Sequence, residues 1–154
     1  MGREIERKFL VRGEAWRALG VGVRYVQGYL CGRPTVRVRL AGEKAYLTIK
    51  GPYSQSGRAE FEYAIPVVDA EEMLNTLCHR PLIEKVRYRI PLDDVAWEVD
   101  EFGGENQGLI LAEVELSSPT QPIVIPDWIG PEVTQDARYY NSNLVTYPYS
   151  QWSN

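Results

Sequence analysis

The sequence has few of the side chains that act as nucleophiles or bind zinc. It contains one histidine, His79, and two isolated cysteines, Cys31 and Cys78. A Ser-His-Asp or Cys-His mechanism would therefore depend on that single histidine. The cysteines show neither zinc-finger spacing nor a disulfide framework, which favours a reducing, cytoplasmic compartment. These shortages argue against the zinc-finger and disulfide-rich classes.

The sequence also lacks long apolar runs and a strong excess of either charge. No run of about 18 apolar residues could span a membrane, and no apolar signal core follows Met1, so we expect neither a membrane segment nor secretion. The formal net charge is −4 and the sequence pI is about 5.1, which makes the chain a poor general DNA ligand. We therefore expect no nucleic-acid or membrane partner.

Basic residues are present in moderate number, but their distribution is uneven. Arginine accounts for 13 of the 17 basic residues. Residues 1–60 carry 12 basic and 5 acidic residues, whereas residues 61–154 carry 5 basic and 16 acidic residues. The planar guanidinium group suits phosphate and carboxylate oxygens, so the asymmetry suggests a polyanion site beside acidic groups. The length suits one domain over residues 1–154.

Period-two alternation of charged and apolar residues dominates the sequence and predicts β-strands. Turn signals, for example at residues 51–52 and 103–104, separate the alternating runs. Eight short strands with short connections suggest an antiparallel meander, a sandwich or a barrel. The predicted strands cover residues 4–9, 24–31, 36–40, 45–50, 58–63, 85–90, 97–100 and 112–116.

A few short helices are predicted beside the strands, so the expected class is mostly β (α+β). Asp69 begins a capping-box pattern that predicts a helix over residues 70–79. Residues 13–19 and 136–146 are predicted to form two further short helices. Residues 117–133 contain four prolines and are predicted to be an irregular connection.

The charged positions share one face of the predicted strands, and periodicity leaves two orientations open. In an ordinary sheet the charged face meets water and the apolar face covers a core. If the sheet closes into a barrel, the charged face lines a lumen and the apolar faces lie outside, under the short helices. Such a lumen would hold the carboxylates of Glu4, Glu6, Glu60, Glu62, Glu98, Asp100, Glu113 and Glu115. It would also hold the bases Lys8, Arg37, Arg39, Lys50, Arg58, Lys85, Arg87 and Arg89.

Residues 4–8 (EIERK) resemble the E-x-E-x-K signature that opens the CYTH superfamily, the triphosphate tunnel metalloenzymes. Other segments resemble successive blocks of that family in the same order, so the resemblance covers nearly the whole chain. These segments are QGYL (27–30), VRVRL (36–40), LTIK (47–50), RAEFEY (58–63), IEKVRYRI (83–90), WEVD (97–100), LAEVEL (111–116) and EVTQDARYYNSNL (132–144). The resemblance implies a closed eight-stranded antiparallel β-barrel that forms a tunnel with its charged face inward.

The resemblance also implies an enzyme that hydrolyses a linear triphosphate with one or two Mg²⁺ or Mn²⁺ ions. We expect the bacterial inorganic tripolyphosphatase type, in which a metal-activated water converts tripolyphosphate to pyrophosphate and phosphate. A class IV-type adenylate cyclase, a nucleoside triphosphatase and a thiamine triphosphatase are alternatives on the same scaffold. A polyphosphate-binding module is the non-enzymatic alternative. The expected partner is a small-molecule triphosphate, and the chain is expected to be a monomer or a homodimer.

Two carboxylate pairs are the expected metal ligands. Side chains at i and i+2 of a strand point the same way, about 7 Å apart. Glu4 with Glu6 and Glu113 with Glu115 form such pairs, and by resemblance they are the main metal ligands and catalytic residues. Hard divalent cations prefer such oxygen ligands. Further candidates for holding the metal or orienting its ligands are Glu60, Glu62, Glu98 and Asp100.

Basic side chains on several predicted strands are the expected triphosphate ligands, because bidentate arginine contacts both bind and orient phosphate. Lys8 shares the face of the first carboxylate pair and is expected to be catalytic as well. Tyr29 is a candidate gating residue. The triphosphate-binding candidates are Lys8, Arg37, Arg39, Lys50, Arg58, Lys85, Arg87 and Arg138.

Overall fold

A computed structural model describes residues 2–152 as one antiparallel sheet of ten strands with a few short helices. The strand order is β1-β6-β5-β4-β3-β7-β8-β9-β2-β10. The strands are β1 (Gly2–Glu4), β2 (Glu6–Val11), β3 (Gly22–Gly32), β4 (Thr35–Ala41), β5 (Lys44–Lys50), β6 (Arg58–Ala64), β7 (Ile83–Leu92), β8 (Val95–Phe102), β9 (Ile110–Glu115) and β10 (Ile129–Glu132). Every predicted run falls on strands, but the run over residues 4–9 is divided between β1 and β2 at Ile5. The predicted mostly β class is confirmed.

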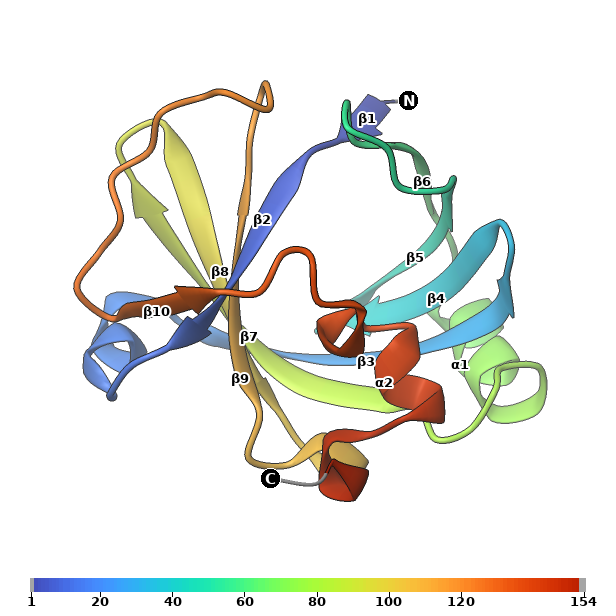
Figure 1. The fold of residues 1–154 in the computed structure, drawn as a ribbon. Coiled ribbons are helices and arrows are strands. Elements are labelled where there is room, and N and C mark those ends of the chain that lie inside the picture. The colour runs from blue at the N-terminus through green and yellow to red at the C-terminus, as the bar shows by residue number, and fades with distance from the viewer. Residues whose placement is uncertain (1, 153–154) are drawn as a thin grey trace.

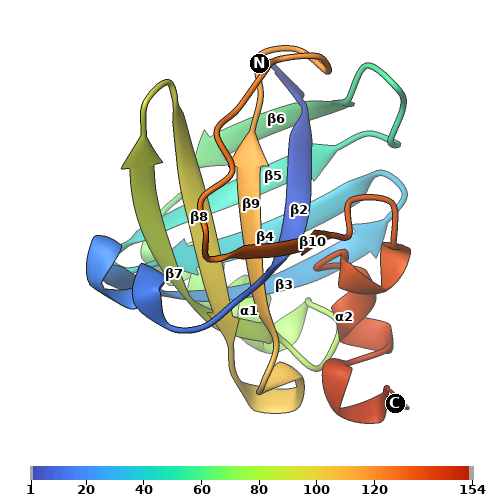
Figure 2. The same cartoon turned by 60° about the vertical axis from the view of Figure 1, so that its left-hand side comes forward.

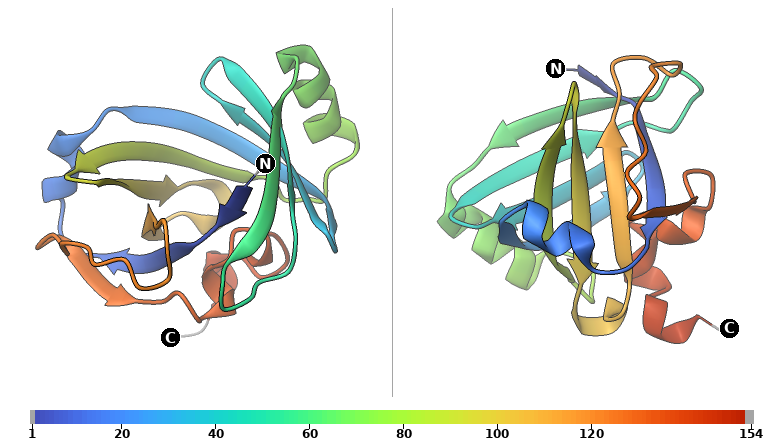
Figure 3. Two further views of the ribbon diagram at one scale, coloured as in Figure 1. Left: turned by 90° about the horizontal axis from the view of Figure 1, so that it is seen from above. Right: turned by 90° about the vertical axis from the view of Figure 1, so that its left-hand side faces the viewer.

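The sheet curls on itself, and the N-terminal strand joins its two sides (Figure 1). β1 pairs with β6, with Glu4 opposite Arg58, whereas β2 pairs with β9, with Lys8 opposite Glu113. Ile5 alone separates the two pairings. Within residues 2–152, hydrogen bonds between strands do not close the sheet, so the predicted closed eight-stranded barrel is not formed by strand pairing. Figure 3 shows the curl from above and from the side.

The charged face of the strands points to the inside of the curl. Lys8, Arg37, Arg58 and Lys85 are all buried, although such side chains are rarely buried without partners. The apolar faces lie outside and form three clusters. The ordinary orientation, with charges toward water, is therefore wrong for this sheet. An apolar residue at alternate strand positions here packs outward under helices and connecting segments.

Each apolar cluster is covered by a different segment. The 3₁₀ helix η1 (Ala15–Leu19) inserts the fully buried Trp16 into the first cluster. The helix α1 (Val67–Thr76) covers the second with Ala70 and Leu74. The C-terminal segment covers the third and lies at one end of the sheet (Figure 2). The elements of this segment are η3 (Ala137–Tyr139), α2 (Asn143–Thr146) and η4 (Tyr149–Gln151). A further short helix, η2 (Gly104–Asn106), lies between β8 and β9.

The helices differ from the predicted ones at their ends. α1 begins at Val67 after Pro66, and no side chain caps it, so the predicted capping box at Asp69 is wrong. Pro66 already has the extended backbone of an N-cap, and this moves the helix start three residues earlier. Asp69 lies in the first turn, where its charge favours the helix dipole. Leu19, at the end of the helix predicted over residues 13–19, is 52% exposed.

Two segments have more structure, or a different division, than predicted. The connection predicted as irregular over residues 117–133 contains β10, which pairs with β2 at the edge of the sheet. An edge strand tolerates Pro131 because one side of it makes no ladder bonds. The helix predicted over residues 136–146 is divided into η3 and α2. No helix within residues 2–152 is long and apolar enough to cross a membrane.

Candidate active site

The inside of the curled sheet contains a highly charged cavity of about 240 Å³. Its walls come from β1 to β9 and from the C-terminal segment. Seven carboxylates line it, namely Glu4, Glu6, Glu60, Glu62, Glu98, Glu113 and Glu115. Seven cationic residues line it as well, namely Lys8, Arg37, Arg39, Lys50, Arg58, Lys85 and Arg87. Tyr29 also lies in the wall. The strands therefore bring nearly all the predicted site residues into one space.

Three predicted positions lie outside this lining. Arg138 is exposed, pairs with Asp136 at 2.8 Å and stacks over Trp152, so it lies on the surface and not beside the cavity. Asp100 is 1% exposed and lies beneath the wall instead of in it. Arg89, expected in the lumen, is exposed on β7 beyond the cavity.

The carboxylates at the N-terminal strand face one another with few cations between them. The Lys50 ammonium donates to both oxygens of Glu4, at 3.0 and 3.1 Å. Burial and repulsion from Glu113 and Glu4 raise the pKa of Glu6 well above its ordinary value. Burial and repulsion from Glu4 also raise the pKa of Glu115. Carboxylates that repel one another in this way favour the binding of an additional cation.

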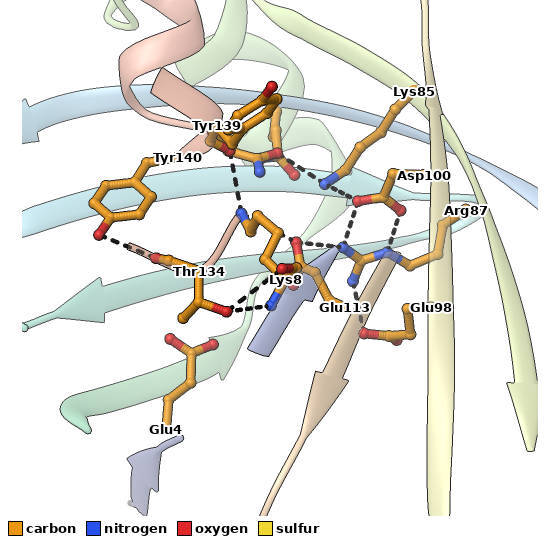
Figure 4. Close-up of polar contacts among 12 residues, drawn as sticks. Glu4, Lys8, Lys85, Arg87, Glu98, Asp100, Glu113, Thr134, Tyr139 and Tyr140 are labelled. Carbon is orange, nitrogen blue, oxygen red and sulfur yellow. Dashed lines mark hydrogen bonds and ion pairs between the residues drawn. The ribbon is translucent and has the colours of Figure 1, made fainter. Parts of the chain in front are cut away.

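Lys8 is held as a cation beside Glu113, its cross-strand partner. The Lys8 ammonium lies 3.5 Å from a Glu113 oxygen and donates to the Tyr139 carbonyl at 3.2 Å (Figure 4). Burial opposes the charge of Lys8, but attraction to Glu113 and Glu6 raises its pKa overall. Burial likewise opposes the charge of Glu113, but Lys8 and Arg87 lower its pKa well below the ordinary value. A protonated Lys8 suits phosphate binding better than proton abstraction.

A buried network around Asp100 orients two cations of the wall. Arg87 donates to both Asp100 oxygens, at 2.7 and 2.8 Å, and Lys85 donates to one of them at 2.8 Å (Figure 4). A third contact joins Arg87 to Glu98 at 3.2 Å. Burial opposes the charge of Asp100, but Arg87 and Lys85 lower its pKa overall. Asp100 therefore acts as a buried counter-ion that fixes the two bases.

The opposite wall holds its arginines mainly with neutral acceptors. Arg37 donates to Thr48 at 3.1 Å and lies 3.5 Å from Glu62, and its Nε has no hydrogen-bond partner among residues 2–152. Arg39 donates from Nε to Gln27 at 2.8 Å. Burial and repulsion from neighbouring arginines lower the pKa of Arg39 to about 9. This wall therefore carries excess positive charge.

Arg58 has a similar setting at the other end of the same wall. Its Nε donates to the Gly51 carbonyl at 3.0 Å, and Nη2 donates to Thr35 at 3.3 Å. Its guanidinium stacks over the Tyr53 ring at 4.0 Å. The Tyr53 ring in turn lies 4.8 Å from that of Tyr140. Two segments distant in sequence therefore meet beside Arg58.

Five further lining residues lie outside the predicted set: Thr35, Tyr53, Tyr140, Asn141 and Ser142. The strand periodicity of β4 could have identified the first of them, because it shares its face with two predicted arginines. The other four belong to irregular segments and have no periodic signal. Their place in the wall depends on how distant segments pack.

The donor set of the cavity suits a hard divalent cation. Its carboxylates offer the oxygen ligands that Mg²⁺ and Mn²⁺ prefer. Burial first, and then repulsion from neighbouring carboxylates, raises the pKa of Glu6 and of Glu115, and a bound cation would oppose both effects. Within residues 2–152, no group of three or more acidic, cysteine or histidine side chains is arranged so that it could hold a metal ion by itself. Mg²⁺ commonly retains several waters and shares substrate phosphates, so it can bind through one or two carboxylates.

Comparison with known proteins agrees with this geometry. The chain matches the CYTH domain over residues 2–146. It is 51% identical over 154 residues to the inorganic triphosphatase of Acetivibrio thermocellus, covering 99% of each chain. It is 39% identical to that of Nitrosomonas europaea, covering 92% of this chain and 96% of the other. A crystal structure of an inorganic triphosphatase, 35% identical, superposes with a TM-score of 0.63 over 94% of this chain and 95% of the other. The chain belongs to the CYTH domain family.

Proposed function

We propose that this protein hydrolyses inorganic triphosphate to pyrophosphate and phosphate with the help of Mg²⁺ or Mn²⁺. The observation that carries the proposal is the cavity lined by seven carboxylates and seven cationic residues. A linear triphosphate carries several negative charges and needs many donors, whereas its metal ions need carboxylate oxygens. Two relatives with the name inorganic triphosphatase support the same reaction.

The basic residues of the cavity would bind and orient the phosphates. Arg37, Arg39 and Arg58 come from one wall, and Lys85 and Arg87 from the other, so a bound chain of phosphates would be held from both sides. Cations fixed in place before the reaction stabilise the negative charge that develops on the phosphate oxygens. All of these side chains except the half-buried Arg39 are buried, which strengthens that effect.

Lys8 and Lys50 would complete the phosphate contacts at the N-terminal strand. Lys8 is held between Glu113 and the Tyr139 carbonyl, beside the proposed metal ligands. Lys50 lies against Glu4 and would be freed for phosphate when a metal ion neutralises that carboxylate.

The carboxylates on β1, β2 and β9 would hold the metal. Glu4, Glu6, Glu113 and Glu115 are the proposed main ligands, since they line the same part of the wall and two of them have raised pKa values. A bound divalent cation supplies Lewis-acid polarisation of phosphate and lowers the pKa of its water. The further candidates that would complete or orient this set are Glu60, Glu62 and Glu98, with Asp100 acting through Lys85 and Arg87.

The cavity would work as a tunnel. The pairings of β1 with β6 and of β2 with β9 support this, because the covalent chain at Ile5 spans the place where the ladder is interrupted. Tyr29 would act as a gate at the wall, where its hydroxyl lies 3.3 Å from Gln27. The exposed position of Arg138 makes any phosphate contact by that residue dependent on movement of its segment.

The remaining features of the proposal concern the whole chain. We place it in the cytoplasm, which the two free cysteines, Cys31 and Cys78, support. A single domain over residues 1–154 would carry the activity, as a monomer or a homodimer. The continuous ten-stranded sheet supports one domain, since β2, near the start of the chain, pairs with β9 and β10 in its second half.

A second candidate substrate is a nucleoside or thiamine triphosphate. A side pocket of about 520 Å³ shares Glu4, Glu6, Lys8, Tyr53 and Tyr140 with the charged cavity. Pockets of this size accommodate drug-sized ligands, so the substituent of a larger triphosphate would have space there. Adenylate cyclase chemistry would need the same space.

A product-resolved assay tests these alternatives. Purified protein is incubated with tripolyphosphate, ATP or thiamine triphosphate, with Mg²⁺ or Mn²⁺, and phosphate, pyrophosphate and cyclic AMP are separated. We expect fastest release of phosphate and pyrophosphate from tripolyphosphate, and none with a chelator. Glu115→Gln should abolish turnover, whereas Glu84→Gln, an exposed control on β7, should not. Cyclic AMP as the main product, or tight binding without turnover, would overturn the proposal.

A further inference from the structure

Arg39 differs from most cations of the cavity because a neutral amide holds it. Lys8, Arg37, Lys50, Lys85 and Arg87 each lie within 4.0 Å of a carboxylate oxygen. Among residues 2–152, Arg39 has no such partner. It donates instead from Nε to the Gln27 amide oxygen at 2.8 Å, and its guanidinium lies over the Tyr25 ring at 4.9 Å.

These two contacts leave the far edge of the guanidinium available. Gln27 accepts a hydrogen bond only from Nε of Arg39, and the Tyr25 ring stacks on only one face of the guanidinium. The two terminal nitrogens have no hydrogen-bond partner within the described part of the chain. They are the fork that binds two oxygens of a phosphate at once. Arg39 lines the cavity, so this fork is accessible to an anion there.

Gln27 is hydrogen-bonded to Asn141, which comes from the distant C-terminal segment. The Asn141 side-chain oxygen accepts from Lys85 at 2.9 Å and from the Gln27 amide nitrogen at 3.2 Å. Arginine can only donate, so the atom of Gln27 facing Arg39 must be the oxygen. The Gln27 nitrogen must then face Asn141, and the atom of Asn141 that accepts from it must be the oxygen. Arg39 thus determines the orientation of both amides.

Gln27 is fully buried and Asn141 lines the cavity wall. Amides in such a place contribute dipoles and no net charge, so they hold Arg39 and Lys85 without adding a negative charge to the wall. A carboxylate in either position would form an ion pair with the nearest base and compete with a bound phosphate. Neutral side chains at these two positions therefore favour anion binding, because they add no negative charge that would compete with a phosphate.

We propose that Gln27 and Asn141 are positioning residues for triphosphate, which hold Arg39 and Lys85 in the cavity wall without placing a further carboxylate there to compete with the ligand. This inference rests on the proposed function, because it assigns the ligand of that same cavity. It also gives the C-terminal segment a role in binding through Asn141. The segment that carries Asn141 lies between η3 and α2.

The Asn141→Asp variant separates this role from a structural one. Aspartate has the same shape and can accept both hydrogen bonds that the Asn141 oxygen accepts, so a purely structural role predicts unchanged kinetics. We expect the KM for tripolyphosphate to rise about tenfold, with kcat changed less than about twofold and no loss of thermal stability. Asn75→Asp, on the exposed side of α1, adds the same charge far from the cavity and should leave KM unchanged.

A second variant and a binding measurement keep the inference testable if turnover is lost. Gln27→Met removes the acceptor of Arg39 and should also raise KM more than it lowers kcat. Titration calorimetry with tripolyphosphate and a chelator should show weaker binding by Asn141→Asp than by the wild type. A KM and a dissociation constant within twofold of wild type for Asn141→Asp would overturn the inference. Wild-type binding without any hydrolysis would overturn the proposed function alone.

Discussion

Replacement of Asp100 by asparagine should destabilise the protein strongly, even without metal. Asp100 is 1% exposed and accepts two hydrogen bonds from Arg87 and one from Lys85, at 2.7 to 2.8 Å. Asparagine keeps the shape but leaves the buried Arg87 guanidinium without its counter-ion. Burial already lowers the pKa of Lys85 to about 7, so Lys85 can lose its proton in the variant. Loss of one partner of a buried ion pair costs about 3–5 kcal/mol, and the remaining amide oxygen places this variant near about 3 kcal/mol. For a chain of this length, that lowers the melting temperature by about 6–12 °C.

The pH dependence gives the same prediction a second readout. Arg87 and Lys85 lower the pKa of Asp100, so its stabilisation is present above the ordinary carboxyl pKa and disappears as pH falls through the lowered value. The stability difference between wild type and Asp100→Asn should therefore shrink below about pH 4. Urea unfolding, followed by tryptophan fluorescence in the presence of a chelator, measures both effects.

A matched control uses the other carboxylate of the same arginine. The Glu98 side chain is 34% exposed and makes one contact with Arg87 at 3.2 Å. Glu98→Gln should cost less than about 1 kcal/mol, because partly exposed ion pairs contribute little. If Asp100→Asn lost no more stability than Glu98→Gln in the chelator, the counter-ion role of Asp100 would be refuted. A defect seen only with metal would instead identify Asp100 as a metal ligand.

Three further variants test other parts of the structure. Glu6→Gln should abolish Mg²⁺-dependent phosphate release but should not lower the melting temperature without metal, because burial and neighbouring carboxylates raise the pKa of Glu6. A lower melting temperature of the metal-free variant would contradict this. Trp16→Ala should lower the unfolding free energy in urea by about 4 kcal/mol, since Trp16 is fully buried against Tyr88, and a loss below about 1 kcal/mol would count against that packing. Glu132→Gln should lower the unfolding free energy in urea by about 0.5 kcal/mol at pH 7, because Arg7 lowers the pKa of Glu132 and the half-exposed ion pair stabilises the fold only above the ordinary carboxyl pKa. The same loss at about pH 3 would contradict the pairing.

The strands and the faces of their side chains could be predicted from the sequence because period two is a property of the extended backbone. Two residues apart on a strand, Arg37 and Arg39 must share a face, and the same holds for Glu113 and Glu115. Periodicity could not say which face is inside, because both orientations satisfy the same alternation. The resemblance of residues 4–8 and of the later segments to the CYTH family made that choice, and the burial of the charged residues agrees with it.

The positions that the sequence did not predict depend on packing between distant segments. Asp100 has the parity of a lumen residue, but its position below the wall follows from the two bases that enclose it. Arg138 belongs to a motif beside the cavity, yet its own pairing with Asp136 directs it to the surface. Tyr53 and Asn141 lie in irregular segments, where the sequence has no periodic pattern that would predict which side chains face the cavity.

The divided N-terminal strand has a consequence for the order of folding. β1 can pair only after residues 58–60 are available, and β2 can pair only after residues 111–115 and β10 are available. These partners are synthesised long after the first strand, and pairing across such sequence separations is slow. β2, which carries Glu6, is therefore expected to dock late, when β9 is available. A nascent or partly folded chain would have no complete set of carboxylates, so its ability to bind metal would report that docking in a refolding experiment.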